Sequence, residues 1–336
     1  MAASSGKKSA RLRIHVENNP KAAAINHVTE AGFRAKAKHH KGLAKRIDIT
    51  FGMDPAKLGP MLAETEVLVA SGGVDISGVA TQAPKLKWIQ STSAGVEKLI
   101  RYVPKGVALT NASGLHAPKG GEYAMTALLM LNHDVPHFVT SQRAGKWLQS
   151  HATPIAGKTL VIVGVGALGG AAARLAKGFG MRILGVSRSG KPSRAVERMY
   201  RSSELRRVLP KADFLLVTTP LTAETKGMIG RKELDLLPRH AGLVNLGRGA
   251  VIDNDALVAK LKKGELKGAV LDVFPEEPLP AASPLWSAPN LIMSPHCGVD
   301  DAESYADRAL DIFLDNLERY LAGRKLINVV DPRLGY

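Results

Sequence analysis

Cysteine is nearly absent from this chain: Cys297 is the only one in 336 residues. A single cysteine excludes an internal disulfide, so the sequence favours a reducing, cytoplasmic location. Cys297 directly follows His296, and a Cys–His nucleophilic pair is one interpretation of the two residues. Neighbours on an extended segment point their side chains to opposite faces, however, which argues against such a pair.

Long apolar runs are also missing. The longest stretch without Asp, Glu, Lys or Arg, Pro278 to Val299, contains five prolines and cannot form a continuous spanning helix. The next, Thr159 to Ala173, is shorter than the roughly 20 apolar residues that a membrane span needs. The N-terminal segment "MAASSGKKSARLR" lacks the apolar core of a secretory signal, although its basic character leaves organelle targeting open, and residues 1–10 are expected to form a disordered tail. We predict no membrane span.

Aromatic residues are few, at 5%, whereas the net charge is +16. Positive charge is typical of nucleic-acid-binding proteins, but so few aromatics provide little surface for stacking bases. The basic residues are dispersed, apart from a cluster at residues 34–46. We therefore expect a solvated basic surface that attracts anionic small substrates and no specific nucleic-acid partner; nucleic-acid binding is an alternative that rests on charge alone.

Short apolar runs alternate with helix-compatible segments along the whole chain, and 336 residues with 45% apolar content predict two domains. Between residues 12 and 112 the runs predict a parallel sheet with crossover helices: "LRIHV", "RIDITF", "EVLVAS", "LKWIQS" and "VALTNA". A second series is typical of strands buried on both faces of a doubly wound sheet, with a ligand crevice at their carboxyl ends: "TLVIVGVG", "MRILGVS", "ADFLLVTT", "AGLVNLG", "GAVLDVF" and "NLIMSP".

Two further segments have helical periodicity. Residues 121–147 predict a long helix that links the two halves, with Pro136 as a break or kink. Residues 305–321 predict a last helix, which we expect to return to the first domain.

The motif G-x-G-x-x-G begins the second series. Gly164, Gly166 and Gly169 lie between a predicted strand and an Ala-rich helix, with Ala167 and Leu168 between the last two glycines. Glycines in this context permit a tight turn and a close approach of pyrophosphate to the amides at the helix N-terminus. The segment therefore predicts a dinucleotide site.

The next strand, "RILGV", ends roughly 20 residues past the motif, where an acidic residue would bind the ribose hydroxyls of NAD. This chain has Ser187, Arg188 and Ser189 there, followed by Lys191. With no carboxylate to repel a 2′-phosphate and with these groups to bind it, NADP(H) is the predicted cofactor, and NAD(H) is possible. Alternatively, Arg188 only stacks on adenine while NAD binds.

Ionisable residues follow three more predicted strands: Arg248 after "LVNLG", Asp272 and the pair Glu276–Glu277 after "GAVL", and His296 after "NLIMSP". Strands of one parallel sheet end at the same edge, so these side chains are expected to meet in one crevice.

At these residues the chain resembles the D-isomer-specific 2-hydroxyacid dehydrogenase family, most closely its NADP-preferring glyoxylate/hydroxypyruvate reductases. The resemblance covers nearly all of the second half and part of the linking segment, and it is thinner in the first domain. It rests on "GVGALGGAAARLAKGFGMRILGVSR", "ADFLLVTTPLTAETKGMIG", "LVNLGRGAVIDNDALVAKLKKGELKGAVLDVFPEEPL", "PNLIMSPH", "GEYAMTALLML", "RAGKW" and "QSTSAGVEKL".

The resemblance implies an α/β protein with a Rossmann-type cofactor domain over residues 115–304, which carries a dimerisation arm, and a smaller flavodoxin-like substrate domain over 11–114 and 305–336. It also implies a homodimer, and we predict no metal. The family's catalytic arginine, glutamate and histidine fall on Arg248, Glu277 and His296. Its cofactor-cleft positions correspond to Thr218, Thr219, Pro220, Leu246, Gly247, Arg248, Asp272, His296 and Gly298, and its substrate loop to Ser93, Ala94 and Gly95.

In such a site His296, as imidazolium, would protonate the alkoxide formed when hydride reaches C2 of a 2-keto acid. Glu277 would orient the imidazole and favour its charged form. Arg248 would bind the substrate carboxylate and polarise the keto oxygen, and amides of residues 93–95 would hold the other carboxylate oxygen. Asp272 matches the position that contacts the nicotinamide carboxamide, or it is only structural.

These inferences predict an NADP(H)-preferring reductase of a small 2-keto acid, glyoxylate or hydroxypyruvate. "TSAGVEKL" departs from the family's common "G-x-D-N" form, and Cys297, Gly298 and Val299 follow the histidine where the family varies. Substrate identity is thus the least constrained inference. Other hypotheses are a nucleotide-sensing scaffold or corepressor, which has no physical need of all three catalytic residues, and formate-type or phosphite-type oxidation.

Overall fold

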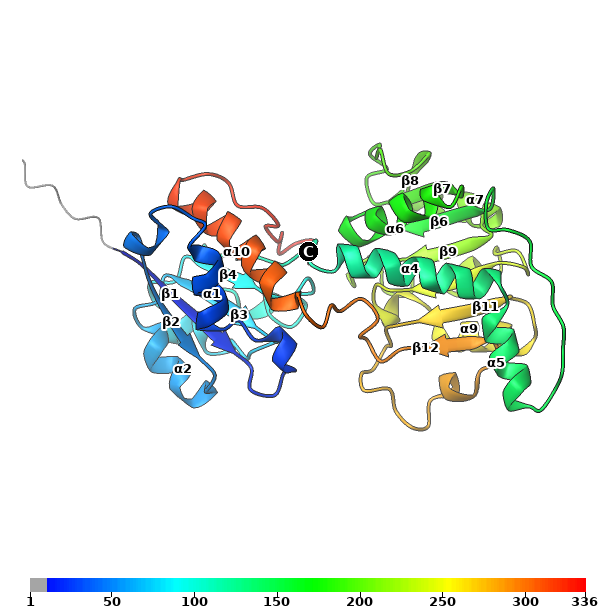
Figure 1. The fold of residues 1–336 in the computed structure, drawn as a ribbon, viewed down its shortest axis with the longest axis horizontal. Coiled ribbons are helices and arrows are strands. Elements are labelled where there is room, and N and C mark those ends of the chain that lie inside the picture. Colours follow the sequence, from blue (N-terminus) through cyan, green and yellow to red (C-terminus); the bar gives the residue numbers. More distant parts are fainter. Residues whose placement is uncertain (1–10) are drawn as a thin grey trace, which may run out of the picture. The chain divides into compact units, whose positions relative to one another are not determined.

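The computed structural model describes residues 11–336 and, for residues 55–57, the backbone only. The expected disordered tail, residues 1–10, lies outside the described residues. The chain forms two compact units (Figure 1): unit 1 comprises residues up to Leu115 together with Asp301–Tyr336, and unit 2 comprises His116–Asp300. The sequence placed these divisions at 114/115 and 304/305.

Unit 1 contains one five-stranded sheet in the order β2-β1-β3-β4-β5, with every pair parallel. This is the flavodoxin-like strand order. Its strands are β1 (Leu12–Asn18), β2 (Ile47–Gly52), β3 (Val67–Ser71), β4 (Trp88–Ser91) and β5 (Ala108–Thr110), and its helices are α1 (Glu30–Ala37), α2 (Pro55–Leu62), α3 (Val79–Gln82) and α10 (Tyr305–Leu321).

Helix α10 comes from the far end of the chain yet lies beside α1 in unit 1 (Figure 1). Its residues Leu310, Phe313, Leu314 and Leu317 recur at the three- and four-residue spacing that places side chains on one helix face. That face is buried in the same core cluster as β1 residue Val16. The apolar periodicity of the segment therefore determines which face of α10 is buried.

Unit 2 contains a seven-stranded parallel sheet in the order β12-β11-β10-β9-β6-β7-β8. Counted from β6 this is the Rossmann order 3-2-1-4-5-6 with one more strand, and the order reverses between β6 and β9. The strands are β6 (Thr159–Val163), β7 (Arg182–Ser187), β8 (Arg198–Arg201), β9 (Phe214–Val217), β10 (Gly242–Asn245), β11 (Gly268–Leu271) and β12 (Leu291–Met293).

Core clusters cover both faces of this sheet. Along β6, Leu160 and Ile162 belong to one cluster, and Val161 and Val163 belong to another. The helices of unit 2 are α4 (Ala117–Asn132), α5 (Val135–Arg143), α6 (Ala167–Gly178), α7 (Leu205–Val208), α8 (Arg231–Leu234) and α9 (Asn254–Lys262). The predicted α/β class, a Rossmann-type doubly wound sheet plus a smaller flavodoxin-like unit, is confirmed.

The edge strand β8 was not predicted. Its sequence, "RMYR", has arginines at both ends, and only Tyr200 among its residues is buried. A strand at the edge of a sheet needs no continuous apolar run, because charged side chains there protect the unpaired edge.

The long helix predicted over residues 121–147 is in fact two helices, and the break precedes Pro136. Asp134 adopts a left-handed conformation with φ of 58° between α4 and α5, and Pro136 lies in the first turn of α5. Proline is tolerated there because the first-turn amides have no partner within the helix. No helix within residues 11–336 is long and apolar enough to cross a membrane.

Candidate active site

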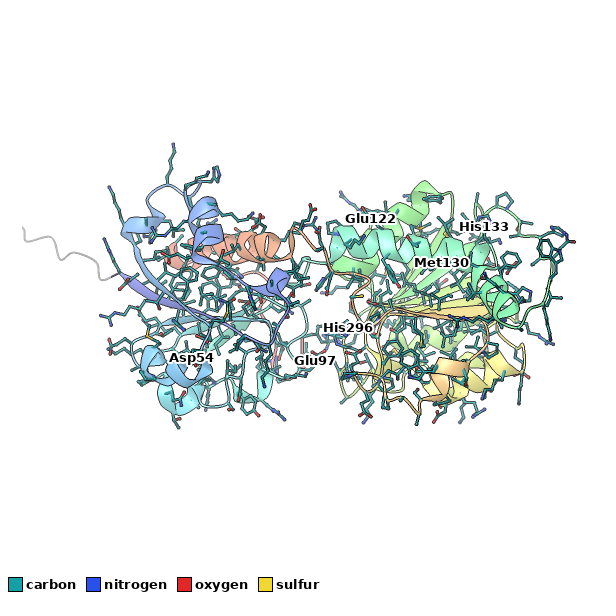
Figure 2. The ribbon with its side chains drawn as sticks, turned by 60° about the horizontal axis from the view of Figure 1, so that its bottom comes forward. Asp54, Glu97, Glu122, Met130, His133 and His296 are labelled. Atoms are coloured by element: carbon teal, nitrogen blue, oxygen red, sulfur yellow. The ribbon has the colours of Figure 1, made fainter. Side chains whose placement is uncertain are left out.

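The ionisable residues singled out in the sequence follow three neighbouring strands of unit 2. Arg248 follows β10, Asp272 and Glu277 follow β11, and His296 follows β12. The parallel pairings β10–β11 and β11–β12 place these ends at one edge of the sheet. Figure 2 shows His296 at that edge.

His296 is paired with Glu277. Their Nδ1 and Oε2 atoms are 2.7 Å apart, and both side chains are partly exposed. The other carboxylate oxygen, Oε1, accepts a 2.9 Å hydrogen bond from the amide of Phe274. Glu277 is therefore held from both sides, and the imidazole has its Nδ1 engaged and its Nε2 on the far side of the ring.

The loop that carries His296 is fixed by Asp272. The His296 amide donates to Ser294 O in a three-residue turn around Pro295, and His296 itself has a left-handed φ of 52°. Oδ1 of Asp272 accepts hydrogen bonds from the amides of Cys297 (3.1 Å) and Gly298 (2.9 Å). A buried carboxylate thus determines where the loop after β12 turns.

Arg248 lies on a loop that approaches the Glu277 loop closely. Its Nη1 donates to Gly247 O at 2.8 Å, and the side-chain amide of Asn245 donates to Arg248 O at 3.1 Å. A Cβ on the next residue, Gly249, would overlap the backbone of Phe274. Glycine is therefore needed for the loops after β10 and β11 to come together.

The loop from β6 to α6 has the close packing expected of a dinucleotide motif. Gly164 has φ of 103°, and a Cβ there would lie 2.9 Å from the backbone of Thr218 and Thr219. A Cβ on Gly169 would overlap Gly164 O, which also accepts a 2.5 Å hydrogen bond from Thr218 Oγ1. A Cβ on Gly166, by contrast, would meet no described atom within 4 Å. That position is open where a pyrophosphate is expected to approach the helix.

Two buried polar atoms of this edge have no hydrogen-bond partner among the described residues: Asp272 Oδ2 and Thr219 Oγ1. Burial raises the pKa of Asp272, although hydrogen bonds from Ser294 and the Gly298 amide oppose this. Buried polar groups are normally paired, so both atoms indicate a ligand with polar groups. The site therefore fits a dinucleotide. Pro220, Leu246 and Gly247 follow the same strand ends, β9 and β10.

The turn after β7 holds the predicted phosphate-binding residues. Ser187 Oγ accepts from the amide of Gly190 at 3.1 Å, and Ser189 Oγ accepts from the amide of Lys191 at 3.3 Å. Arg188 is exposed on this turn. Each serine hydroxyl accepts with its oxygen in these bonds and keeps its hydrogen for another acceptor.

The substrate loop, Ser93, Ala94 and Gly95, lies in unit 1 after β4. The carbonyls of Ser93 and Ala94 accept hydrogen bonds from Ala112 N (3.0 Å) and Asn111 Nδ2 (2.9 Å). The amides of Ala94 and Gly95 donate to no acceptor that the structure describes. Arg248, Asp272, Glu277 and His296 lie together in unit 2, whereas the substrate loop belongs to unit 1.

Comparison with known proteins gives consistent results. The family model for the NAD-binding domain of D-isomer specific 2-hydroxyacid dehydrogenases matches residues 125–298. Glyoxylate/hydroxypyruvate reductase B of Pectobacterium atrosepticum is 34% identical over 288 residues, which are 83% of this chain and 90% of that protein. The chain belongs to the D-isomer-specific 2-hydroxyacid dehydrogenase family.

Solved structures of this family have the same fold. A Xanthobacter autotrophicus D-isomer specific 2-hydroxyacid dehydrogenase in complex with NADPH and MES has a TM-score of 0.81 at 28% identity, covering 97% of this chain and 100% of that one. The NADPH-dependent glyoxylate/hydroxypyruvate reductase of Sinorhizobium meliloti, with NADP and sulfate, has a TM-score of 0.79 at 25% identity and the same coverage. The protein is thus an NAD(P)-dependent D-2-hydroxyacid dehydrogenase, as the sequence predicted.

The extended segment expected at His296 and Cys297, which disfavoured a nucleophilic pair, is wrong. His296 is not on an extended segment, because its φ is positive. The pair is disfavoured for another reason: desolvation and the charges of Asp272 and Asp300 raise the pKa of the Cys297 thiol, which disfavours the thiolate that a nucleophile needs. Within residues 11–336 no group of three or more His, Cys, Asp or Glu side chains is arranged to hold a metal ion.

Sequence reasoning missed His116, which directly precedes α4. Its Nδ1 lies 3.4 Å from Asp300 Oδ1. Burial lowers the pKa of His116, as do the charges of His296 and Arg248, and Asp300 opposes them. His116 therefore lies close enough to the dehydrogenase site for the charges of His296 and Arg248 to affect its pKa. Because it follows no strand of unit 2, strand-end reasoning gave no signal for it.

The contrast between Gly166 and Gly169 gives a testable prediction. We expect Gly166→Ala to fold normally but to weaken NADPH binding about tenfold or more, because its methyl group would occupy the space left for the pyrophosphate. The matched variant Gly169→Ala should instead lower the free energy of unfolding by about 1–3 kcal/mol through overlap with backbone. Fluorescence titration measures NADPH binding, and urea unfolding measures the free energy of unfolding. A loss of stability in Gly166→Ala would contradict the assignment of Gly166 to the pyrophosphate site.

Proposed function

We propose that this dehydrogenase reduces a small 2-keto acid, glyoxylate or hydroxypyruvate, with NADP(H) as preferred cofactor. The observation that supports this most strongly is the 2.7 Å pair of His296 Nδ1 and Glu277 Oε2 at the sheet edge that also carries Arg248. The relatives named above as glyoxylate/hydroxypyruvate reductases support the substrate class.

The proton donor of the proposed reaction is His296. A nicotinamide held at this sheet edge would supply the hydride to C2 of the keto acid, and a proton would then be needed on the oxygen of that carbon. Nδ1 of His296 is engaged by Glu277, so Nε2 is the atom that donates the proton and, in the reverse direction, accepts it. Glu277 fixes the ring and stabilises its positive charge, and the Phe274 amide holds Glu277 in turn.

Arg248 is the substrate anchor in this proposal. Its guanidinium binds the carboxylate and polarises the keto oxygen, where preorganised positive charge lowers the barrier. The amides of Ala94 and Gly95 are the donors proposed for the other carboxylate oxygen. Their lack of a described acceptor supports that role, because the carbonyls of the same loop are already hydrogen-bonded.

The cofactor preference rests on the turn after β7. It offers the guanidinium of Arg188, the Lys191 ammonium and the hydroxyl hydrogens of Ser187 and Ser189, and residues 187–191 contain no carboxylate. A 2′-phosphate carries the negative charge that these groups would bind. On the nicotinamide side, we assign the unpaired Oδ2 of Asp272 to the carboxamide.

Arg188→Ala provides the test of the cofactor preference. We expect the dissociation constant of NADPH to rise about 10- to 100-fold, because a charge-assisted hydrogen bond to the phosphate is lost, whereas that of NADH changes little. Arg182→Ala is the matched control, since Arg182 is exposed at the other end of β7 and pairs with Glu197 at 3.1 Å. Equal losses for NADPH and NADH would mean that Arg188 contacts a part common to both cofactors.

We further propose a cytoplasmic homodimer that uses residues 144–158 as its dimerisation arm. This segment contains no helix or strand, and it carries Trp147, whose side chain is 92% exposed, and Leu148, which is 50% exposed. Apolar exposure of this extent is typical of a surface that another chain covers. Sedimentation velocity of the purified chain tests the assembly.

The experiment that tests the function is a set of initial rates with glyoxylate and hydroxypyruvate, each with NADPH and NADH. Rapid turnover with a strong NADPH preference is the expected result. Turnover with NADH alone would retain the enzyme class and overturn the cofactor preference. A bulkier 2-keto acid preferred more than about tenfold in kcat/KM, roughly 1.4 kcal/mol, would overturn the substrate assignment.

A further inference from the structure

Asp272 is hydrogen-bonded on one side only. Its Oδ1 accepts three hydrogen bonds, from Ser294 Oγ (2.6 Å) and from the amides of Cys297 (3.1 Å) and Gly298 (2.9 Å). Its Oδ2 accepts none from the described residues, although the side chain is fully buried. The carboxylate is therefore oriented by Oδ1, and Oδ2 is left for another donor.

Tyr123 extends this arrangement. Its hydroxyl lies 2.5 Å from Ser294 Oγ. Ser294 has one hydroxyl hydrogen, and a carboxylate can only accept, so Ser294 donates to Asp272 and Tyr123 donates to Ser294. The order of donation is thus Tyr123 to Ser294 to Asp272, and each group orients the next.

Two further contacts hold the three residues in place. The Ser294 amide donates to Leu271 O at 3.0 Å, which extends the β11–β12 pairing and places Ser294 beside Asp272. A Cβ on Gly298 would lie 2.6 Å from the Tyr123 ring, so the ring packs against the loop after His296. Tyr123 belongs to α4, and its hydroxyl reaches Ser294 only because residue 298 has no side chain.

We propose that Tyr123 and Ser294 are positioning residues that hold Asp272 with its Oδ2 directed to the carboxamide of the nicotinamide ring. The inference rests on the cofactor placement in the proposed function and extends it to two residues outside the cofactor contacts. We call the hydrogen-bonded series Tyr123–Ser294–Asp272 the relay. Because Asp272 also accepts from the amides of Cys297 and Gly298, the relay links the cofactor carboxamide to the loop that carries His296.

The test compares the dinucleotides NADP+ and NAD+ with their 3-acetylpyridine analogues, which lack the carboxamide N–H donor. Binding is followed by fluorescence titration of the full-length protein, without turnover. The wild type is expected to favour the carboxamide form over the analogue by about 3- to 10-fold, the value of one hydrogen bond. Ser294→Ala and Tyr123→Phe should reduce this ratio towards one, and Ser294→Thr, which retains the hydroxyl, should keep it.

Each outcome decides a separate point. Loss of discrimination in Ser294→Ala and Tyr123→Phe, with 2′,5′-ADP binding unchanged, supports the relay. The relay is overturned, and the proposed function stands, if both variants prefer the carboxamide dinucleotide over the 3-acetylpyridine analogue as strongly as the wild type does. The same conclusion follows if both variants bind every ligand more weakly, including 2′,5′-ADP. If the wild type itself does not discriminate, the Asp272–carboxamide contact fails, and the relay fails with it. Tyr123→Phe removes a single oxygen atom, so it tests the idea even if Ser294→Ala is unstable.

Discussion

His296→Gln is expected to lower kcat by about 10²- to 10⁴-fold, the usual contribution of a positioned general acid. Glutamine retains a polar side chain of similar size but has no proton to transfer at neutral pH. The Gly-rich loop and Asp272 are unchanged by the substitution, so the dissociation constant of NADPH should stay within a few-fold of wild type. Initial rates at saturating substrate and fluorescence titration of the cofactor measure the two quantities.

The chain offers a matched control for this variant. His240 forms a similar pair with Asp213, 3.0 Å between Nε2 and Oδ1, but the two residues precede β10 and β9, at the amino ends of the strands. His240→Gln should leave kcat unchanged. Near-normal turnover in His296→Gln would remove this histidine from the reaction, whereas a loss in both variants would indicate a general effect on unit 2.

Arg248→Ala is expected to reduce kcat/KM by about 10³-fold, because the substrate loses the cation that binds its carboxylate and stabilises the charge formed on the keto oxygen. KM should rise and kcat should fall together, since the same group acts in both the bound state and the transition state. Arg248→Lys keeps the charge but loses the planar fork, so it should recover only part of the loss.

Arg239→Ala is the control for Arg248. Arg239 is exposed near the amino end of β10, where it donates to Gly264 O at 3.2 Å. Its removal should leave both kinetic constants unchanged. A KM that stays constant in Arg248→Ala would contradict the assignment of this arginine to the substrate carboxylate.

The strands of both sheets were predictable because parallel strands buried on both faces are continuous apolar runs. β8 was the exception, since an edge strand carries no such run. The helix break near Pro136 was predicted, but its position at Asp134 was not, because proline is tolerated in a first helical turn. The local sequence therefore predicts most helices and strands, whereas the residues at which they end depend on the backbone conformation.

The site was predictable in part. Arg248, Asp272 and His296 each follow a strand of one sheet, so their common edge follows from topology. From the residues alone, Glu276 and Glu277 were equivalent candidates, and only the resemblance to the family selected Glu277. The structure supplies the physical reason, since the Glu277 carboxylate lies between the Phe274 amide and the His296 ring. The roles of these residues remain predictions that the variants above test.

The sequence by itself determined the two-domain α/β class, the dinucleotide loop and the family, because these depend on local periodicity and on glycines at fixed spacing. Only the tertiary structure decided which side chains are partners. Tyr123 and Ser294 are separated by 171 positions, and His296 and Glu277 by 19, and each pair meets because strand register and helix packing bring distant loops together. Hydrogen bonds have short range and a strict direction, so no pattern along the chain specifies them before the sheet has formed.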